Sequence, residues 1–153
     1  MNTIYQISDC HLSDESSYEN LSRALEFVNN DTNCDTIFLT GDICCNPKSG
    51  DYVRLEAFIR EHINEQSIYA IAGNHDDSCL MRTELKGSTI FVTDKAMINE
   101  RKFVFLDSSF KPLDRRHPTG SGRIDNRGMA KIKQQLKKAN NPIVVVHHPV
   151  IPV

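Results

Sequence analysis

The stretch IYQISDCHL, residues 4–12, places a charged pair at the end of a strand pattern. Its side chains alternate between two faces, as they do in a β-strand. Asp9 and His11 then follow two positions apart, which on an extended chain would point them the same way. A carboxylate and an imidazole are costly to bury unless something compensates them. We therefore expect a ligand, most simply a metal ion, at the end of this strand.

Strand and helix patterns alternate along the rest of the chain. The expected strands are 3–8, 35–40, 67–72 and 143–146, of which 35–40 and 143–146 have the apolar composition of buried strands. The expected helices are 17–30, 51–63 and 126–140, the first with Ser16 or Ser17 as its cap. Residues 88–109 predict short strands in a hairpin, with a polar turn near 99–102. This alternation predicts an α/β fold of layered sheets and helices.

The composition is that of an ordinary globular protein, with 153 residues, 39% hydrophobic and 25% charged. No apolar run has the roughly 20 residues that a membrane span needs, and the N-terminus lacks the features of a signal peptide. We therefore expect a cytoplasmic protein that does not enter a membrane. The five cysteines are odd in number and match no zinc-finger spacing, which favours reduced thiols. Cys10 is expected to be structural.

Charge is distributed unevenly along the chain. Residues 1–110 contain 9 Lys and Arg against 18 Asp and Glu, whereas residues 111–138 contain 9 against 2. A basic segment beside an acidic body could help to attract an anionic substrate, with Arg115, Arg116 and His117 in a loop that could contact it. Aromatic residues are not interleaved with the basic ones, so a nucleic-acid partner is not expected.

Each of the four expected strands outside the hairpin is followed by residues that bind metals or transfer protons. In order, they are Asp9-Cys10-His11, Gly41-Asp42, Gly73-Asn74-His75-Asp76 and His147-His148-Pro149. The carboxyl ends of parallel strands lie along one edge of a sheet, so these segments should converge. Carboxylate, imidazole and amide groups suit Mn, Fe or Zn better than Ca²⁺. Asp42 could bridge two such ions, about 4 Å apart, which would clamp a phosphoryl group for in-line attack.

These segments resemble the motifs of the calcineurin-like metallophosphoesterase superfamily, which are D-x-H, G-D, G-N-H-[DE], a histidine before a proline, and G-H-x-H. The spacing and the segment LDSS, residues 106–109, are most similar to the class III cyclic-nucleotide phosphodiesterases. The resemblance covers essentially the whole chain. It implies a layered α/β/β/α sandwich over residues 1–153.

The resemblance also implies a role for each residue of the site. Its implied metal ligands are Asp9 and His11 on a first ion, Asp42 as the bridge, and Asn74 and His147 on a second ion. His75 would not be a ligand but would contact the phosphate and protonate the leaving oxygen. Asp76 would orient His75. His147 is preferred to its neighbour His148 because the family's ligand stands two residues before the proline.

Two departures from the family pattern matter. The protein phosphatases of the superfamily continue G-D-x-x-D-R-G, which is absent after Asp42, so a phosphoprotein phosphatase is not expected. The G-H-x-H motif, which supplies one imidazole to each ion, is also absent. The chain therefore resembles the N-terminal two-thirds of the usual domain, incomplete at its C-terminus. Its apolar ending leads us to expect a truncated chain; the alternative is a complete protein that takes the missing ligands from a partner chain, as in a homodimer.

The expected function is a metal-dependent phosphoesterase. Its small substrate would be a phosphodiester, most specifically a 3',5'-cyclic nucleotide such as cAMP, attacked at phosphorus by a metal-bound hydroxide. The implied cofactors are two divalent ions, Mn, Fe or Zn. The alternative is a truncated or non-catalytic scaffold of the same fold that binds a metal or a nucleotide, which the missing G-H-x-H favours. A redox role for Cys44 and Cys45 is weak, because adjacent cysteines do not form a C-x-x-C pair.

Overall fold

Strands and helices alternate as the sequence predicts, in a computed structural model that describes residues 3–110, 120–137 and 140–149. The strands are β1 Thr3–Ile7, β2 Cys34–Thr40, β3 Ser67–Ile71, β4 Ile90–Phe91, β5 Lys95–Ile98, β6 Arg101–Leu106 and β7 Ile143–Val146. The helices are α1 Glu15–Asn29, α2 Asp51–His62, α3 Ser78–Glu84 and α4 Asn126–Lys137. None of these helices is long and apolar enough to cross a membrane.

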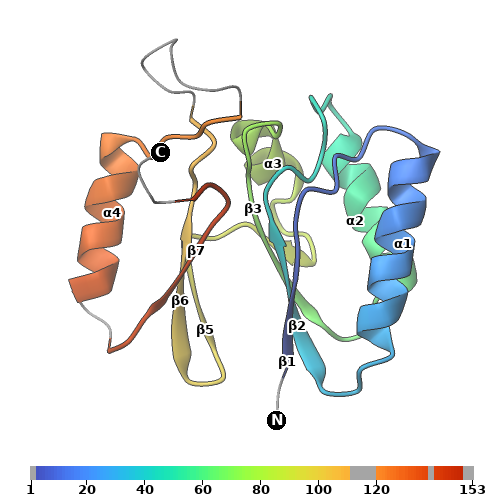
Figure 1. The fold of residues 1–153 in the computed structure, drawn as a ribbon, viewed down its shortest axis with the longest axis horizontal. Helices are drawn as coiled ribbons and strands as arrows, with labels where there is room; N and C mark the ends of the chain where they lie inside the picture. Colours follow the sequence, from blue (N-terminus) through green and yellow to red (C-terminus); the bar gives the residue numbers. More distant parts are fainter. Residues whose placement is uncertain (1–2, 111–119, 138–139, 150–153) are drawn as a thin grey trace.

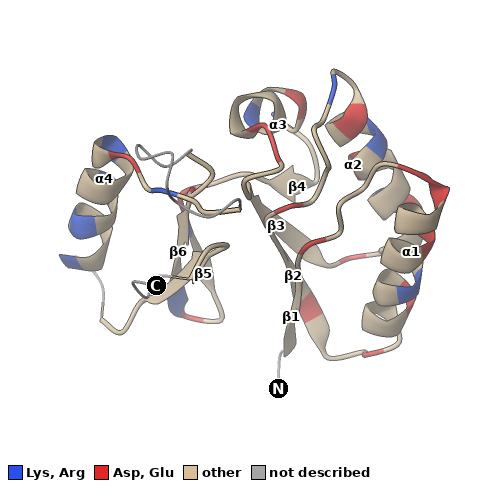
Figure 2. Cartoon of the chain, turned by 45° about the horizontal axis from the view of Figure 1, so that its top comes forward, with Lys and Arg blue, Asp and Glu red and all other residues tan. Residues whose placement is uncertain are grey.

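The described elements form four layers (Figure 1). Helices α1 and α2 cover one face of the sheet β1-β2-β3-β4. The second sheet, β5-β6-β7, packs against the other face of the first sheet, and α4 covers the outer face of the second sheet. The predicted α/β/β/α sandwich is therefore confirmed. The basic residues of α4 lie exposed on its surface (Figure 2).

The first sheet is parallel, and its register levels the ends of its strands. Ile7 pairs with Leu39, and Thr40 pairs with Ile71, so β1, β2 and β3 end at nearly the same height. On the helix side, buried apolar side chains such as Leu25 form the main core. This register brings the segments after the three strands to one edge, as the sequence predicted.

Helix α1 begins earlier than the sequence suggested. Asp14 is its N-cap, and its side chain accepts a hydrogen bond from the Ser17 backbone N–H over 2.9 Å. Ser17 in turn accepts one from the Asp14 backbone N–H, over 3.1 Å, which completes a capping box. The expectation that Ser16 or Ser17 caps the helix was wrong, because Ser17 is the reciprocal partner three residues further on.

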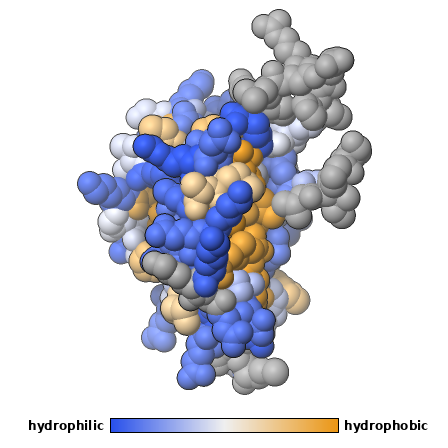
Figure 3. Space-filling model, turned by 90° about the vertical axis from the view of Figure 1, so that its left-hand side faces the viewer, coloured by the Kyte–Doolittle hydropathy of each residue, from blue (hydrophilic) through white to orange (hydrophobic). Residues whose placement is uncertain are grey.

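The second sheet joins a hairpin to a parallel edge strand. Strands β5 and β6 pair antiparallel around a turn at Asn99 and Glu100, which confirms the predicted hairpin. Strand β7 pairs parallel with β6 alone among the described strands. Its Ile143 and Val144 are 37% and 41% exposed, so the expectation of a buried strand was wrong: β7 lies at the edge of its sheet. Figure 3 shows hydrophobic surface among hydrophilic side chains on the side of the molecule that carries α4.

The two sheets are held together by an aromatic cluster. It contains Phe38 and Ile71 from the first sheet, and Ile98, Phe103 and Phe105 from the second. The ring of Phe38 meets the rings of Phe103 and Phe105 edge-on, with centroids 5.2 and 5.4 Å apart. This edge-to-face geometry is favourable for aromatic pairs. Because the cluster sets the position of the second sheet, it also sets where the segment after β7 lies.

Helix α3 was not expected from the sequence. Asp77 caps it by accepting hydrogen bonds from the backbone N–H groups of Cys79 and Leu80. The helix has 7 residues and a single buried side chain, Met81. It is therefore too short to produce a clear helical periodicity in the sequence.

Candidate metal centre

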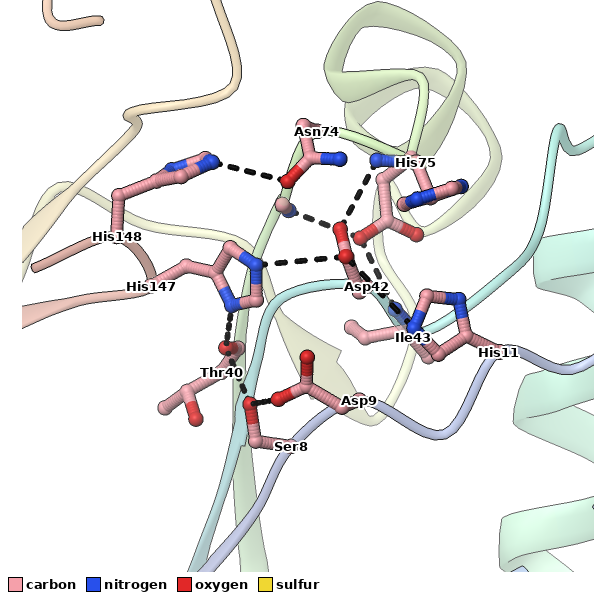
Figure 4. A network of polar contacts seen from close by, with 12 residues as sticks. Ser8, Asp9, His11, Thr40, Asp42, Ile43, Asn74, His75, His147 and His148 are labelled. Carbon is pink, nitrogen blue, oxygen red and sulfur yellow. Dashed lines mark hydrogen bonds and ion pairs between the residues drawn. The ribbon is translucent and has the colours of Figure 1, made fainter. Parts of the chain in front are cut away.

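Polar side chains from four segments meet at the carboxyl ends of β1, β2, β3 and β7 (Figure 4). Asp9 and His11 come from the segment after β1, Asp42 from that after β2, His75 from that after β3, and His147 from that after β7. The expected convergence is therefore present, although β7 belongs to the second sheet and not, as expected, to the same sheet as β1, β2 and β3. It joins residues more than 130 positions apart in the chain.

Asp42 lies at the centre of this site. Its carboxylate is buried, and its Oδ1 accepts a hydrogen bond from the His75 backbone N–H over 2.9 Å. Its Oδ2 lies 3.8 Å from Nε2 of His11 and 3.5 Å from Nε2 of His147. A Cβ at Gly73 would lie 2.2 Å from Oδ1, so only glycine fits beside this carboxylate. A buried carboxylate between two imidazoles suits a bound cation, which would compensate its charge.

His147 is held in the orientation of a metal ligand. Its Nδ1 lies 2.9 Å from the carbonyl oxygen of Thr40, which can only accept, so Nδ1 carries the proton. The lone pair of Nε2 then faces Asp42. Histidine ligands of metals commonly donate their other ring N–H to a backbone carbonyl in this way. Gly41 makes room for the ring, because a Cβ there would lie 2.4 Å from it.

His148 faces a different part of the site. It is buried, with Nδ1 2.7 Å from the Ser108 hydroxyl and Nε2 2.9 Å from Oδ1 of Asn74. Burial lowers the pKa of His148, and the neighbouring His147 lowers it further. A neutral His148 that donates from Nε2 and accepts at Nδ1 satisfies both contacts. The second histidine therefore holds the side chain of Asn74, while the first points at Asp42.

The potential ligand atoms fall into two groups. One contains Asp9, Asp42 and His147, and the other His11, Cys45 and His75; within each, the ligand atoms lie within 4.8 Å of one another. The carboxylates and imidazole of the first group match the donor set that Mn, Fe and Zn accept. Asp42 lies between the groups, since its Oδ2 is near His11 as well as His147.

The geometric reason for pairing Asp9 with His11 was wrong. Strand β1 ends at Ile7, and the backbone φ angles of Asp9 and His11 are 58° and 46°, so this segment is not extended. Asp42 and Asn46 also have positive φ angles. Such angles are uncommon outside glycine, and strained backbone tends to gather at functional sites. The four strained residues lie in two adjacent segments of this site.

The expectation that Asp76 orients the ring of His75 was wrong. Its Oδ1 accepts from the Cys44 N–H and the Tyr52 hydroxyl, and its Oδ2 accepts from the N–H groups of Ile43 and Gly73. These four bonds use the four lone-pair positions of the carboxylate. Burial raises the pKa of Asp76, against the lowering effect of the backbone hydrogen bonds. Asp76 therefore ties the segment after β2 to the segment after β3.

The cysteines near the site differ in environment. Cys10 packs against the main core, as expected, and burial raises its pKa to about 11. Cys44 is buried, and burial raises its pKa to about 12. Cys45 is partly exposed, with its Sγ 3.9 Å from Nδ1 of His75. Cys45 was not predicted as a potential ligand, although its place three residues after Asp42 was a usable signal.

Two other contacts were not predicted from the sequence: those of the Thr40 carbonyl and the Ser108 hydroxyl, which orient the two neighbouring histidines. A backbone acceptor leaves no mark in the sequence. Ser108 belongs to the LDSS segment, which was noted only as part of a resemblance. The basic loop residues Arg115, Arg116 and His117 lie outside the described residues.

Comparison with known proteins identifies the family of this chain. The chain is 25% identical to a probable cyclic nucleotide phosphodiesterase of Colwellia psychrerythraea over 95% of its length, and 24% identical to another of Coxiella burnetii over 97%. It spans 56% and 60% of the length of these two relatives. A solved structure of an Aquifex aeolicus protein of unknown function covers 94% of this chain and 88% of its own, at 14% identity, with a TM-score of 0.42 that is too low to support an argument. The family model for calcineurin-like phosphoesterases matches residues 3–152, and the chain belongs to this family.

Proposed function

We propose that this chain forms the metal-binding part of a phosphodiesterase that hydrolyses 3',5'-cyclic nucleotides, cAMP among them. The observation that carries the proposal is the position of Asp42, a buried carboxylate whose Oδ2 lies 3.5 and 3.8 Å from two imidazoles. The names of the two relatives support the substrate class. Because the chain spans 56% and 60% of their lengths, its activity by itself is part of the proposal.

The proposed metal ligands are Asp9, His11, Asp42, Asn74 and His147, with Asp42 shared between two ions. When bound, divalent ions of the Mn, Fe or Zn kind would neutralise charge on the phosphate and activate a water molecule. The residues around the ligands hold them in position. The Thr40 carbonyl fixes the tautomer of His147, and His148 holds Asn74 through one of the two lone pairs of its Oδ1, which leaves the other free.

His75 is the proposed general acid. Its backbone N–H is fixed by Asp42, and its ring is partly exposed at the edge of the site. The ring meets that of His11 edge-on, with centroids 4.8 Å apart. A histidine held beside the phosphate can give its proton to the leaving oxygen, an effect worth about 10²–10⁴ in rate.

The experiment that tests the proposal is hydrolysis in the presence of Mn²⁺. We expect hydrolysis of bis-p-nitrophenyl phosphate and of the cyclic phosphodiester of cAMP, with weaker activity on the monoester p-nitrophenyl phosphate. His75→Ala should lower the rate by about 10²–10⁴ while the bound manganese stays the same. His62→Ala is the matched control, because His62 lies on α2 and its ring contacts the backbone of Phe58.

Three results would contradict parts of the proposal. A preference for the monoester would rule out the diester assignment. Loss of manganese from His75→Ala would make His75 a ligand. Binding of Mn²⁺ or cAMP without turnover would favour the second candidate, a non-catalytic scaffold of the same fold.

A further inference from the structure

A sulfur atom lies beside the two histidines at the outer side of the site. The ligand atoms of His11, Cys45 and His75 all lie within 4.8 Å of one another, and the Cys45 Sγ is 3.9 Å from Nδ1 of His75. All three residues are partly exposed, so an ion from solution can approach them. This group differs from the group of Asp9, Asp42 and His147, which contains only oxygen and nitrogen donors.

The spacing fits a small tetrahedral ion. Zinc binds sulfur at about 2.3 Å and imidazole nitrogen at about 2.0–2.1 Å, which places tetrahedral ligand atoms about 3.6 Å apart. The observed 3.9 Å between Sγ and Nδ1 needs only a small adjustment to meet this value. Two imidazoles and a thiolate are a strong set for Zn²⁺ and Cd²⁺ and a poor one for Mn²⁺ or Mg²⁺.

We propose that His11, Cys45 and His75 form a binding site for a thiophilic divalent ion such as Zn²⁺, and that an ion bound there inhibits phosphoester hydrolysis. Binding breaks the S–H bond of Cys45, forms a bond between the metal and sulfur, and releases one proton to the solvent. The ion also occupies a lone pair of His75, so that His75 can no longer act as a general acid. In addition, it competes for His11 with the ion that supports hydrolysis. The inhibitory part of this inference rests on the proposed function, whereas the binding part does not.

The other cysteines provide the contrast that makes the site testable. Cys34 and Cys44 are buried, and Cys10 packs against the main core. Cys79 is exposed on α3, outside both ligand groups. A sulfur-to-metal signal that depends on Cys45 but not on Cys79 therefore identifies this site.

Cobalt is the probe, because Co²⁺ replaces Zn²⁺ and gives an intense near-ultraviolet charge-transfer band when a thiolate binds it. We expect wild type and the matched control Cys79→Ser to show the band on addition of Co²⁺, and Zn²⁺ to remove it. Cys45→Ser should lack the band while its circular dichroism spectrum matches that of wild type. A band that survives in folded Cys45→Ser, or no band in wild type, would overturn the site.

Inhibition is measured separately, with Mn²⁺ supporting hydrolysis and Zn²⁺ added in increasing amounts. We expect inhibition of Cys45→Ser to need at least about tenfold more Zn²⁺ than inhibition of wild type, each compared with its own uninhibited rate. Equal sensitivity would overturn the inhibitory role. A Cys45-dependent cobalt band without any hydrolysis would support the site and contradict the proposed function. Hydrolysis without the band would support the proposed function and overturn the site.

Discussion

The two halves of the molecule contribute unequally to its core and to its site. The first half, formed by β1–β4 with α1–α3, contains a cluster of 20 buried apolar residues. In the second half, formed by β5–β7 with α4, the cluster between β6 and α4 has three, Val104, Leu106 and Ile132. All the proposed ligands except His147 follow strands of the first half. The well-packed half therefore carries most of the site, and docking of the less buried half brings in its last ligand.

The largest effect is expected where the halves meet at Asp42. Asp42→Asn should lower Mn²⁺-supported hydrolysis by about 10³-fold or more and reduce bound manganese, because an amide is a weaker ligand and cannot neutralise two ions. Metal analysis and a rate assay check this. Glu19→Gln is the matched control, since it removes one charge from an exposed position on α1. Unchanged turnover in Asp42→Asn would contradict the bridging role.

Core substitutions should reveal the difference in packing directly. Leu25→Ala, at a fully buried position on α1, should lower the free energy of unfolding by about 2–5 kcal/mol. Ile132→Ala, on α4 in the three-residue cluster, should lower it less, by about 1–2 kcal/mol, because the neighbours in this small cluster can move more easily into the space left behind. Urea unfolding of both variants measures the difference. Equal losses would show that the second half is packed as firmly as the first.

His148 tests the junction in a different way. His148→Ala removes the contact to Asn74 across the two halves and should weaken manganese binding by about 10- to 100-fold. The pKa of this histidine is lower in the folded state, so its contribution to stability is present above the ordinary pKa of about 6.5 and is lost as pH falls through the folded value. The stability difference between wild type and His148→Ala should therefore shrink on acidification in that range. A difference that stays constant from pH 8 to pH 4 would argue against a neutral, buried His148.

The smallest effect is expected at an ion pair between the halves. Asp94 lies 3.3 Å from Arg82 on α3 and 3.0 Å from Lys131 on α4. Burial alone would raise the pKa of Asp94, but the hydrogen bond from Lys131 and the charges of Lys131 and Arg82 outweigh it and lower the pKa. The stabilisation is therefore present above the ordinary pKa of about 3.9 and is lost as pH falls through the lower, folded value.

Because all three side chains are substantially exposed, Asp94→Asn should lower the free energy of unfolding by less than about 1 kcal/mol at neutral pH, and by less still in high salt. Chemical unfolding at two salt concentrations and at pH 7 and pH 3 measures this. A larger loss that salt does not reduce would show that Asp94 stabilises the fold by more than an exposed, salt-screened ion pair.

The sequence predicted elements that have a long, regular pattern. The strands β1, β2 and β3, the helices α1, α2 and α4 and the β5–β6 hairpin each have enough alternating or helical periodicity to be recognised. Helix α3 is too short for that, and the exposure of Ile143 and Val144 depends on which strands lie next to β7. The position of a strand in a sheet is a property of the whole fold, which local pattern does not contain.

For the site, the sequence predicted which segments converge but not how their side chains point. For the segments after β1, β2 and β3, convergence follows from the parallel order of the strands, which their apolar composition indicates, whereas His147 is brought in by the second sheet. The positive φ angles of Asp9 and His11 redirect those side chains, and no residue type in that segment indicates such angles. Asp76 and Cys45 took unexpected partners because the contacts from Asp76 to Ile43 and Cys44, and from Cys45 to His75, join positions that are 30 or more residues apart.

The most direct measurement is an anomalous diffraction map from crystals of this chain soaked in Mn²⁺. We predict an anomalous peak within bonding distance of the Asp42 carboxylate, with Asp9 or His147 among the other ligands. Ordered manganese elsewhere in the crystal, with none at Asp42, would contradict this prediction.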